Sequence, residues 1–256
     1  MTEFRRKFMN TYIDDMTLEE AVNHIEKCVI EKKIAHVITP NVDQIVRIEY
    51  DDYFKKICEA CEMLLVDGHP LLWIAKLYGS PFKQKICGSD LVPLLCELAS
   101  EKGYSVFFLG AAPGVAARAA TNMQMKYPNL KVAGTYSPPV GFEKNSEELI
   151  KINQILKESK ADMLFVGMGV PKQDRFIYEN KNKYNIPISF SIGGTIDFLA
   201  GEQKRAPLWM RKIGFEWLFR LLSDPKRMCK RYIIDDTKII KLIFKYWPKK
   251  GMRKNK

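Results

Sequence analysis

Short apolar runs rich in Val, Ile and Phe recur along the first 200 residues of this 256-residue chain, and segments with helical spacing of apolar residues separate them. Runs of this kind are typical of strands buried on both faces of a sheet, and the helical segments are long enough to cross between parallel strands. The pattern predicts an α/β fold with a mainly parallel sheet flanked by helices. The expected strands are 35–39, 63–67, 105–109, 131–135, 162–166 and 188–192, and the expected helices are 43–60, 91–102, 115–126, 146–157 and 172–184.

The residues directly after each run are the first candidates for a site, because Rossmann-like sheets bind ligands at the carboxyl ends of their strands. Thr39 and Asn41 offer hydrogen-bonding side chains suited to sugar hydroxyls or a uracil edge, and they fit an ordinary helix N-cap equally well. Asp67 ends a very apolar run. From the residues alone, a cap on the following helix explains Asp67 better than a ligand contact does.

Two glycine-containing turns could hold phosphate groups. Gly110 to Gly114 follows a strand and opens a helix, so it fits either a phosphate-binding turn or a plain tight turn. Gly167 to Gln173 carries two glycines and a proline, then Lys172 and Gln173 at a helix start. Such a turn can bind a diphosphate, with Gln173 reading a sugar or base, and the alternative is a strand-to-helix turn with both side chains in solvent.

Cysteine and histidine usage predicts no metal or redox site. The six cysteines are spread without a framework, as reduced cysteines are in cytosolic proteins. Cys58 and Cys61 form a CxxC, but no second pair follows it. His24 and His36 are isolated and His69 is typical of a turn, so no metal-binding triad is expected.

The net charge of +11 is concentrated at the C-terminal end. Residues 204–256 hold 17 Lys/Arg against 4 Asp/Glu, whereas residues 1–203 hold 24 against 26. The chain therefore divides into an α/β domain, 1–203, and a basic helical appendage, 204–256. A polybasic segment on a near-neutral body indicates an anionic partner, which could be nucleic acid, an acidic membrane or phosphates.

Residues 233–247 have the pattern of a basic amphipathic helix. An ordinary helix docked on the core has the same periodicity, but the lysines at 249, 250, 254 and 256 and the interfacial anchor Trp247 favour an anionic leaflet. No signal peptide or long apolar span is recognisable, so we expect a cytoplasmic protein attached peripherally to the inner face of the membrane. Ile233, Ile240, Ile243, Phe244 and Trp247 form the expected apolar side, and Lys238, Lys241 and Lys245 the basic side.

Several linked motifs resemble the WecG/TagA/CpsF glycosyltransferase family across nearly the whole chain. Several motifs that follow one another in the family's order are a far more specific signal than any single motif. The C-terminal ones are Gly167 to Asp174, Gly193 to Gly201, Lys204 to Pro207, Phe215 to Arg220, Pro225 to Arg227 and Arg231-Tyr232. Upstream, Thr39 to Asn41, Val66 to Gly68, Gly88 to Leu91, Phe108 to Gly110, Gly134 to Tyr136 and Gly141-Phe142 fit the same template.

The resemblance implies an inverting, metal-independent transferase that needs no cofactor. It would move N-acetylmannosamine from UDP-N-acetylmannosamine to undecaprenyl-diphosphate-linked N-acetylglucosamine, in teichoic acid or surface polysaccharide synthesis. Asp67 would be the general base, Thr39 and Asn41 would line the donor or acceptor pocket, and Gln173 would contact substrate. The further substrate-binding residues expected are Gly110, Gly169, Lys172 and Gly194.

Four cations complete the expected site. A family arginine before Gly88 is replaced by Lys85, which keeps the charge but loses the bidentate fork. The family's appendage is thought to place arginines over the active site at the membrane, and Arg220, Arg227 and Arg231 match them. Guanidinium groups could neutralise the leaving UDP where other enzymes use a metal.

Three alternatives stay open at this stage. Another donor, UDP-N-acetylmannosaminuronic acid or UDP-glucose, would fit the same family. A nucleic-acid-binding protein would use the basic segment, although no recognised nucleic-acid module is present. A dinucleotide-dependent oxidoreductase would rest on the turn at Gly110, which lacks an acidic ribose partner at the expected offset. A homo-oligomer that masks the appendage in solution is also conceivable.

Overall fold

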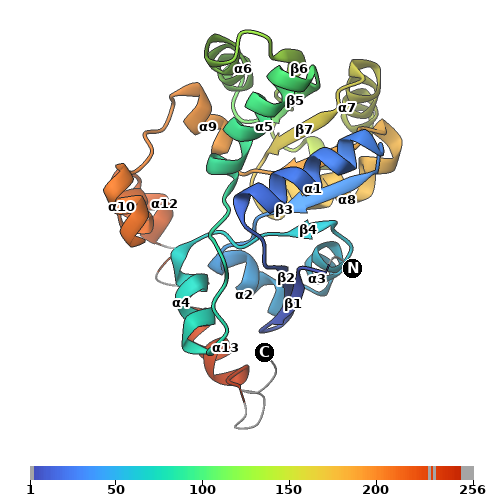
Figure 1. Cartoon of the computed structure of the whole chain (residues 1–256). Coiled ribbons are helices and arrows are strands. Elements are labelled where there is room, and N and C mark those ends of the chain that lie inside the picture. The colour runs from blue at the N-terminus through green and yellow to red at the C-terminus, as the bar shows by residue number, and fades with distance from the viewer. Residues whose placement is uncertain (1–2, 230–231, 233–234, 249–256) are drawn as a thin grey trace.

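The computed structural model describes residues 3–229, 232 and 235–248. Its centre is a parallel six-stranded sheet in the order β4-β3-β8-β7-β5-β6 (Figure 1). All six expected strands are present, which confirms the predicted Rossmann-like α/β class. The strands are β3 (Ala35–Ile38), β4 (Met63–Leu64), β5 (Ser105–Gly110), β6 (Lys131–Tyr136), β7 (Met163–Gly167) and β8 (Ile188–Ser191).

Helices cover both faces of this sheet. Alternate residues of a strand point to opposite faces, so Phe108 and Phe165 pack under one helical layer and Phe107 and Leu164 under the other. The first layer holds α1 (Leu18–Ile30), α5 (Gly88–Lys102), α6 (Val115–Lys126) and α9 (Thr195–Ala200), and the second holds α7 (Ser146–Ser159) and α8 (Lys172–Tyr184). A third apolar cluster joins β3 and β4 to α2 (Val42–Tyr50), α3 (Asp52–Glu59) and α4 (His69–Leu77).

Two local features differ from the expectation. The single helix predicted over 43–60 is two helices, because Asp51 is extended and its Oδ1 accepts the Phe54 N–H at 2.9 Å to cap α3. A hairpin of β1 (Arg5–Phe8) and β2 (Thr11–Asp14) was not expected at all. Asp14 pairs with Arg5 at 2.8 Å and accepts the Leu64 N–H at 2.8 Å, so the hairpin is joined to β4.

The appendage folds back onto the body. It contains α10 (Leu208–Ile213), α11 (Glu216–Ser223), α12 (Pro225–Cys229), a 3-10 turn η3 (Asp236–Lys238) and α13 (Ile239–Lys245). Leu242 is 2% exposed within the cluster of α2 and α4, and the Tyr78 hydroxyl donates to the Ile243 carbonyl at 2.8 Å. None of the helices in the described part of the chain is both long and apolar enough to span a bilayer.

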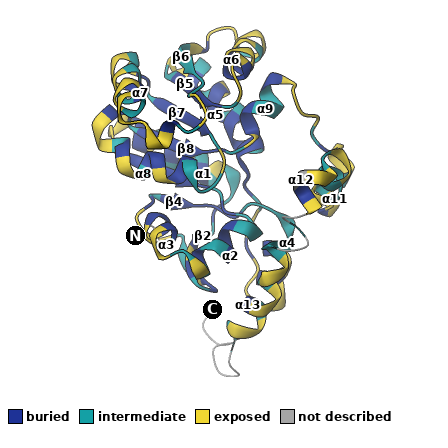
Figure 2. Ribbon diagram, turned by 180° about the vertical axis from the view of Figure 1, so that it is seen from behind, coloured by how far each residue is buried: buried dark blue, intermediate teal, exposed yellow. Residues whose placement is uncertain are grey.

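The expected apolar side of the helix at 233–247 is only partly covered in α13. Ile243 packs on the body, whereas Ile240 and Phe244 stay exposed, and most of α13 is exposed in Figure 2. Lys245 pairs with Glu49 of α2, and the Tyr246 hydroxyl donates to Glu49 at 2.9 Å. Part of the helix therefore docks on the body, as in the alternative that the sequence left open, while other apolar residues stay exposed, and Ile233 lies outside the described residues.

A buried acid lies below the carboxyl ends of the central strands. Asp174 in α8 is completely buried, and within the described residues its carboxylate oxygens make no hydrogen bond of good geometry. Burial raises the pKa of Asp174 to about 7, and Ser191 and Arg47 offset only part of that cost. His36 lies against the same serine, its Nε2 2.9 Å from Ser191 Oγ, and burial lowers the pKa of His36 to about 3.

Asp174→Asn should change how stability depends on pH. Between about pH 4 and pH 7 the native wild type keeps a proton on Asp174 that the unfolded chain has lost, so its stability falls as pH rises, by at most about 4 kcal/mol. Asparagine has no such proton. Urea denaturation should therefore show the variant gaining free energy of unfolding relative to wild type from pH 5 to pH 8. An equal difference at both pH values would contradict this, and Asp52→Asn, at an exposed carboxylate of α3, is the control.

Candidate functional site

Two cavities adjoin at the carboxyl ends of β3, β4, β7 and β8, and they share Asn41, Asp67 and Arg220. The first, here called the polar pocket, has a volume of about 350 Å³ and is lined by backbone and small polar side chains, including Thr39, Gln44, Ser89, Ser191 and Thr195. The second, the apolar pocket, has a volume of about 380 Å³, and its walls include Pro70, Trp73, Trp217, Ile239 and Ile240. Asp67 therefore stands where a polar and an apolar binding space meet.

Asp67 is placed by the pairing of β4 with β3. The ladder continues past the two strands, with the Leu65 N–H donating to Ile38 and the Asp67 N–H donating to Pro40 at 2.8 Å. The following helix α4 is capped by Gly68, whose φ of +104° suits glycine, and no side chain caps it. The cap on α4 that the residues alone favoured for Asp67 is therefore not formed.

Asn41 forms the N-cap that the sequence offered as one of its two roles. It is the N-cap of α2, because its Oδ1 accepts the Gln44 N–H at 3.4 Å while Gln44 Oε1 accepts the Asn41 N–H at 3.1 Å. It also lines both pockets, and Thr39 lines the polar one. The cap uses only the amide oxygen of Asn41.

Gln173 joins the loops that form one wall of the polar pocket. Its side chain is buried, and Oε1 accepts the N–H groups of Met168 at 3.4 Å and Gly193 at 3.1 Å. These bonds hold the loop after β7 against the loop after β8. Gly169 and Gly194 line the same pocket, so the two loops present backbone to a ligand there.

Gly110 and Lys172 lie outside both pockets. At Gly110 φ is +114°, and a Cβ would lie 2.3 Å from the Gly167 carbonyl oxygen, so glycine is needed where β5 approaches β7. Lys172 pairs with Glu143 at 3.0 Å, and its ammonium lies over the Phe142 ring. Each therefore has a packing partner away from the cavities.

A partly buried carboxylate from the appendage contacts cations from both parts of the chain. Glu216 of α11 contacts Arg220 Nη2 at 2.7 Å and Lys85 Nζ at 3.4 Å. Burial lowers the pKa of Lys85, but Cys87 and the nearby carboxylates of Asp67, Glu216 and Asp90 raise it more. Burial likewise opposes the charge of Arg220, whose pKa Glu216 and Asp67 raise above its usual range. Both cations thus stay charged at the junction.

A second carboxylate, Asp90, extends the contact between the body and the appendage. It lies in the first turn of α5 and pairs with Arg205 at 2.7 Å, with Lys85 at 3.6 Å and with Arg211 at 3.7 Å. Negative and positive side chains therefore alternate along one row, which runs Asp90, Lys85, Glu216, Arg220. Sequence reasoning missed Glu216, Asp90, Arg205 and Arg211, although all but Arg211 stood inside motifs already noted. Contacts between residues more than 100 positions apart leave no local signal.

The side chains of the two remaining expected arginines are outside what the structure describes. Arg227 lies in α12, and its side chain is not among those described. Arg231 lies outside the described residues. Of the expected cations, Lys85 and Arg220 are therefore the two that the structure brings beside Asp67.

Comparison with known proteins identifies the family. The profile described as "Glycosyl transferase WecG/TagA/CpsF family" matches residues 6–253. The chain belongs to this glycosyltransferase family. The resemblance seen in the linked motifs is confirmed, and the shared residues of the two pockets belong to a glycosyltransferase.

The relatives share most of their length with this glycosyltransferase. A protein of Bacillus spizizenii is 29% identical over 91% of the chain and 88% of its own length. A protein of Bacillus subtilis is 31% identical over 82% and 80%, and one of Staphylococcus aureus is 26% identical over 84% and 83%. Each of the three is named N-acetylglucosaminyldiphosphoundecaprenol N-acetyl-beta-D-mannosaminyltransferase.

Proposed function

We propose that this chain transfers N-acetylmannosamine from UDP-N-acetylmannosamine to undecaprenyl-diphosphate-linked N-acetylglucosamine, with inversion and without a metal. The observation that carries the proposal is the position of Asp67 at the junction of a polar and an apolar pocket. A sugar nucleotide suits the first space and a lipid-linked acceptor suits the second. The names of the relatives support the same transferred sugar and the same acceptor.

The donor would lie in the polar pocket. Thr39, Ser89 and the amide of Asn41 offer hydrogen bonds to the sugar and base, and the loops at Gly169 and Gly194 allow backbone N–H groups close to phosphate. Arg220 stands at the junction, where the diphosphate would leave. Lys85 lines only the apolar pocket, so its ammonium is suited to the acceptor's own diphosphate.

The chemistry needs a base and a stabilised leaving group. Asp67 would take the proton of the acceptor hydroxyl as that oxygen attacks the anomeric carbon from the side opposite UDP. The bond from carbon to the UDP oxygen breaks, its electron pair leaves with UDP, and the configuration inverts. Arg220 would stabilise the growing charge on the diphosphate, with Arg227 and Arg231 as further candidates.

Asp67→Asn tests the assignment of the base. The amide has nearly the same shape but cannot accept the proton, so kcat should fall by at least about 100-fold while UDP affinity changes little. Radiolabelled transfer to a short-chain acceptor and calorimetric titration of UDP measure the two effects. Transfer near the wild-type rate by a folded variant would exclude Asp67 as the base. Asp52→Asn, at an exposed carboxylate outside both pockets, is the matched control.

Glu216 is proposed as a positioning residue. Without an anion between them, Lys85 and Arg220 would repel each other in a poorly hydrated space, and unpaired buried charge is costly. Glu216 holds both side chains at the junction before any diphosphate arrives. It also ties α11 to the body, so the same contact sets where the appendage covers the site.

Glu216→Gln should separate turnover from nucleotide binding. We expect kcat to fall about tenfold, or about 1.4 kcal/mol, because Arg220 loses the partner that orients it. UDP affinity should stay the same or rise, since the site becomes more positive. Glu216→Asp, which keeps the charge, should recover part of kcat. Equal losses of kcat and UDP affinity would instead indicate a merely structural role, and Glu202→Gln, at the exposed ion pair with Arg118, controls for charge removal.

The membrane face of the protein is proposed to lie beside the apolar pocket. Exposed apolar side chains of α4 and α13 gather there, and these two helices lie side by side in both views (Figures 1 and 2). Residues 204–256 would thus act as a membrane-associating appendage that attaches peripherally to the anionic inner leaflet. The residues concerned are Trp73, Leu77, Ile240, Phe244 and Trp247, with Lys76, Lys241 and Lys245 beside them.

Phe244→Ser should weaken binding to vesicles that contain anionic lipid, by about fivefold or more, because it removes a large apolar contact from the proposed face. Co-flotation at low and high salt measures this, and wild-type binding should also fall at high salt. Phe244 is 72% exposed, and Ile150 of α7 is 67% exposed on a remote part of the molecule. Ile150→Ser should leave binding unchanged, and equal effects of the two variants would refute the assigned face.

A further inference from the structure

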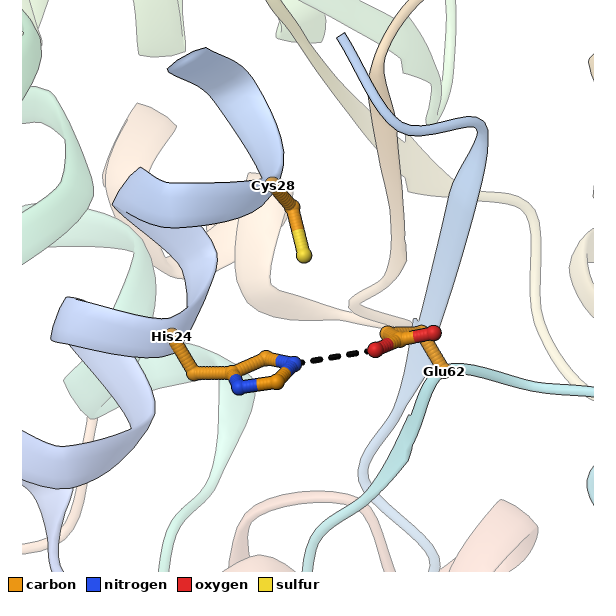
Figure 3. Close-up of side chains that lie close together, drawn as sticks. All are labelled: His24, Cys28 and Glu62. Atoms are coloured by element: carbon orange, nitrogen blue, oxygen red, sulfur yellow. Dashed lines mark hydrogen bonds and ion pairs between the residues drawn. The ribbon is translucent and has the colours of Figure 1, made fainter. Parts of the chain in front are cut away.

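His24, Cys28 and Glu62 lie close together (Figure 3). They are at the amino end of β4, whereas the pockets lie at the carboxyl ends of the strands. His24 and Cys28 are four residues apart on α1 and so lie on the same side of the helix. Glu62 directly precedes β4, where the backbone brings it under α1. One imidazole nitrogen, the thiol sulfur and one carboxylate oxygen all lie within 4.8 Å of one another. The sequence pattern left His24 isolated, because its hydrogen-bonding partner Glu62 is 38 residues away and nothing local places Glu62 beside α1.

We propose that these three side chains form a binding site for Zn²⁺. Imidazole, thiolate and carboxylate are the ligands that zinc takes in proteins, and their atoms stand roughly 3.3 to 3.8 Å apart around a tetrahedral ion, so the arrangement needs only small side-chain movements. Cys28 is 2% exposed and, among the described residues, its sulfur makes no hydrogen bond. Water would take the fourth position.

The present contacts of Glu62 would have to open for the ion to bind. His24 Nε2 lies 2.9 Å from Glu62, and Lys33 Nζ lies 2.8 Å from Glu62, and both contacts use Oε1. Lys33 is about half exposed, so its ammonium can turn to solvent when a cation binds. The negative charges of a thiolate and a carboxylate together balance the two positive charges of Zn²⁺, and a neutral imidazole adds no charge.

The thiol of Cys28 must lose its proton on binding. Zinc binds the thiolate form of cysteine, so the S–H bond breaks, the Zn–S bond forms and the proton passes to solvent.

The site would act on the fold and not on the transfer reaction. None of its three residues lines either pocket. Glu62 already connects the β1–β2 hairpin to β4, since Arg5 Nη2 donates to its carbonyl at 2.9 Å and β4 follows it directly. Zinc would add a bond from α1 to the start of the strand that leads to Asp67.

Titration of the metal-free full chain with Co²⁺, followed by competition with Zn²⁺, tests the proposal. We expect one equivalent of Co²⁺ to give a thiolate-to-cobalt charge-transfer band, absent in Cys28→Ser and formed with at least tenfold weaker affinity in His24→Gln and Glu62→Gln. Zn²⁺ should raise the melting temperature of wild type and not that of the two glutamine variants, whose metal-free melting shows whether they fold.

Cys58→Ser and Cys96→Ser are the matched controls, because both remove a buried thiol elsewhere and should leave the band intact. Absence of the band in wild type would overturn the proposal. So would a band that persists in Cys28→Ser and disappears in Cys58→Ser, because the CxxC would then be the ligand. Neither readout depends on transferase activity.

Discussion

The pairing of β4 with β3 is the interaction on which the site depends. β4 has only two residues, yet its ladder sets where Asp67 lies relative to Asn41. Such a short strand gains little from its own hydrogen bonds, so its register needs outside support. The β1–β2 hairpin supplies it: Asp14 accepts the Leu64 N–H, and Arg5, paired with Asp14, reaches the carbonyl of Glu62. The N-terminal hairpin is thus part of what places the proposed base.

Electrostatics at the junction impose a second constraint. Lys85 comes from the body and Arg220 from the appendage, and both are partly buried near Asp67. Cations can be held there before substrate binds only if an anion accompanies them. Glu216 meets that need, and it stands on the same helix as Arg220. The charge pattern therefore fixes the appendage on the body and prepares the site at once.

Much of the fold could be predicted because periodicity is a local property. All six central strands follow from apolar runs, whereas the hairpin has strands of four residues with mixed polarity and gives no such signal. The candidate site was only partly predictable. Nothing local says that β4, β3, β8 and β7 are neighbours and that β5 lies beyond them, and this order leaves Gly110 outside the pockets. Likewise Lys172 is adjacent to Gln173 in sequence but pairs with Glu143.

The C-terminal helix shows how one pattern can serve two surfaces. Amphipathic spacing predicts an apolar side but not what covers it. In α13 Leu242 packs on the body, while Ile240 lines the apolar pocket and is also more than half exposed. The wall of that pocket is thus continuous with the exposed apolar face of the protein. If a lipid-linked acceptor enters from a membrane, it meets α13 before it reaches Asp67. The docking of this helix on α2 and α4 therefore also determines how the acceptor reaches the site.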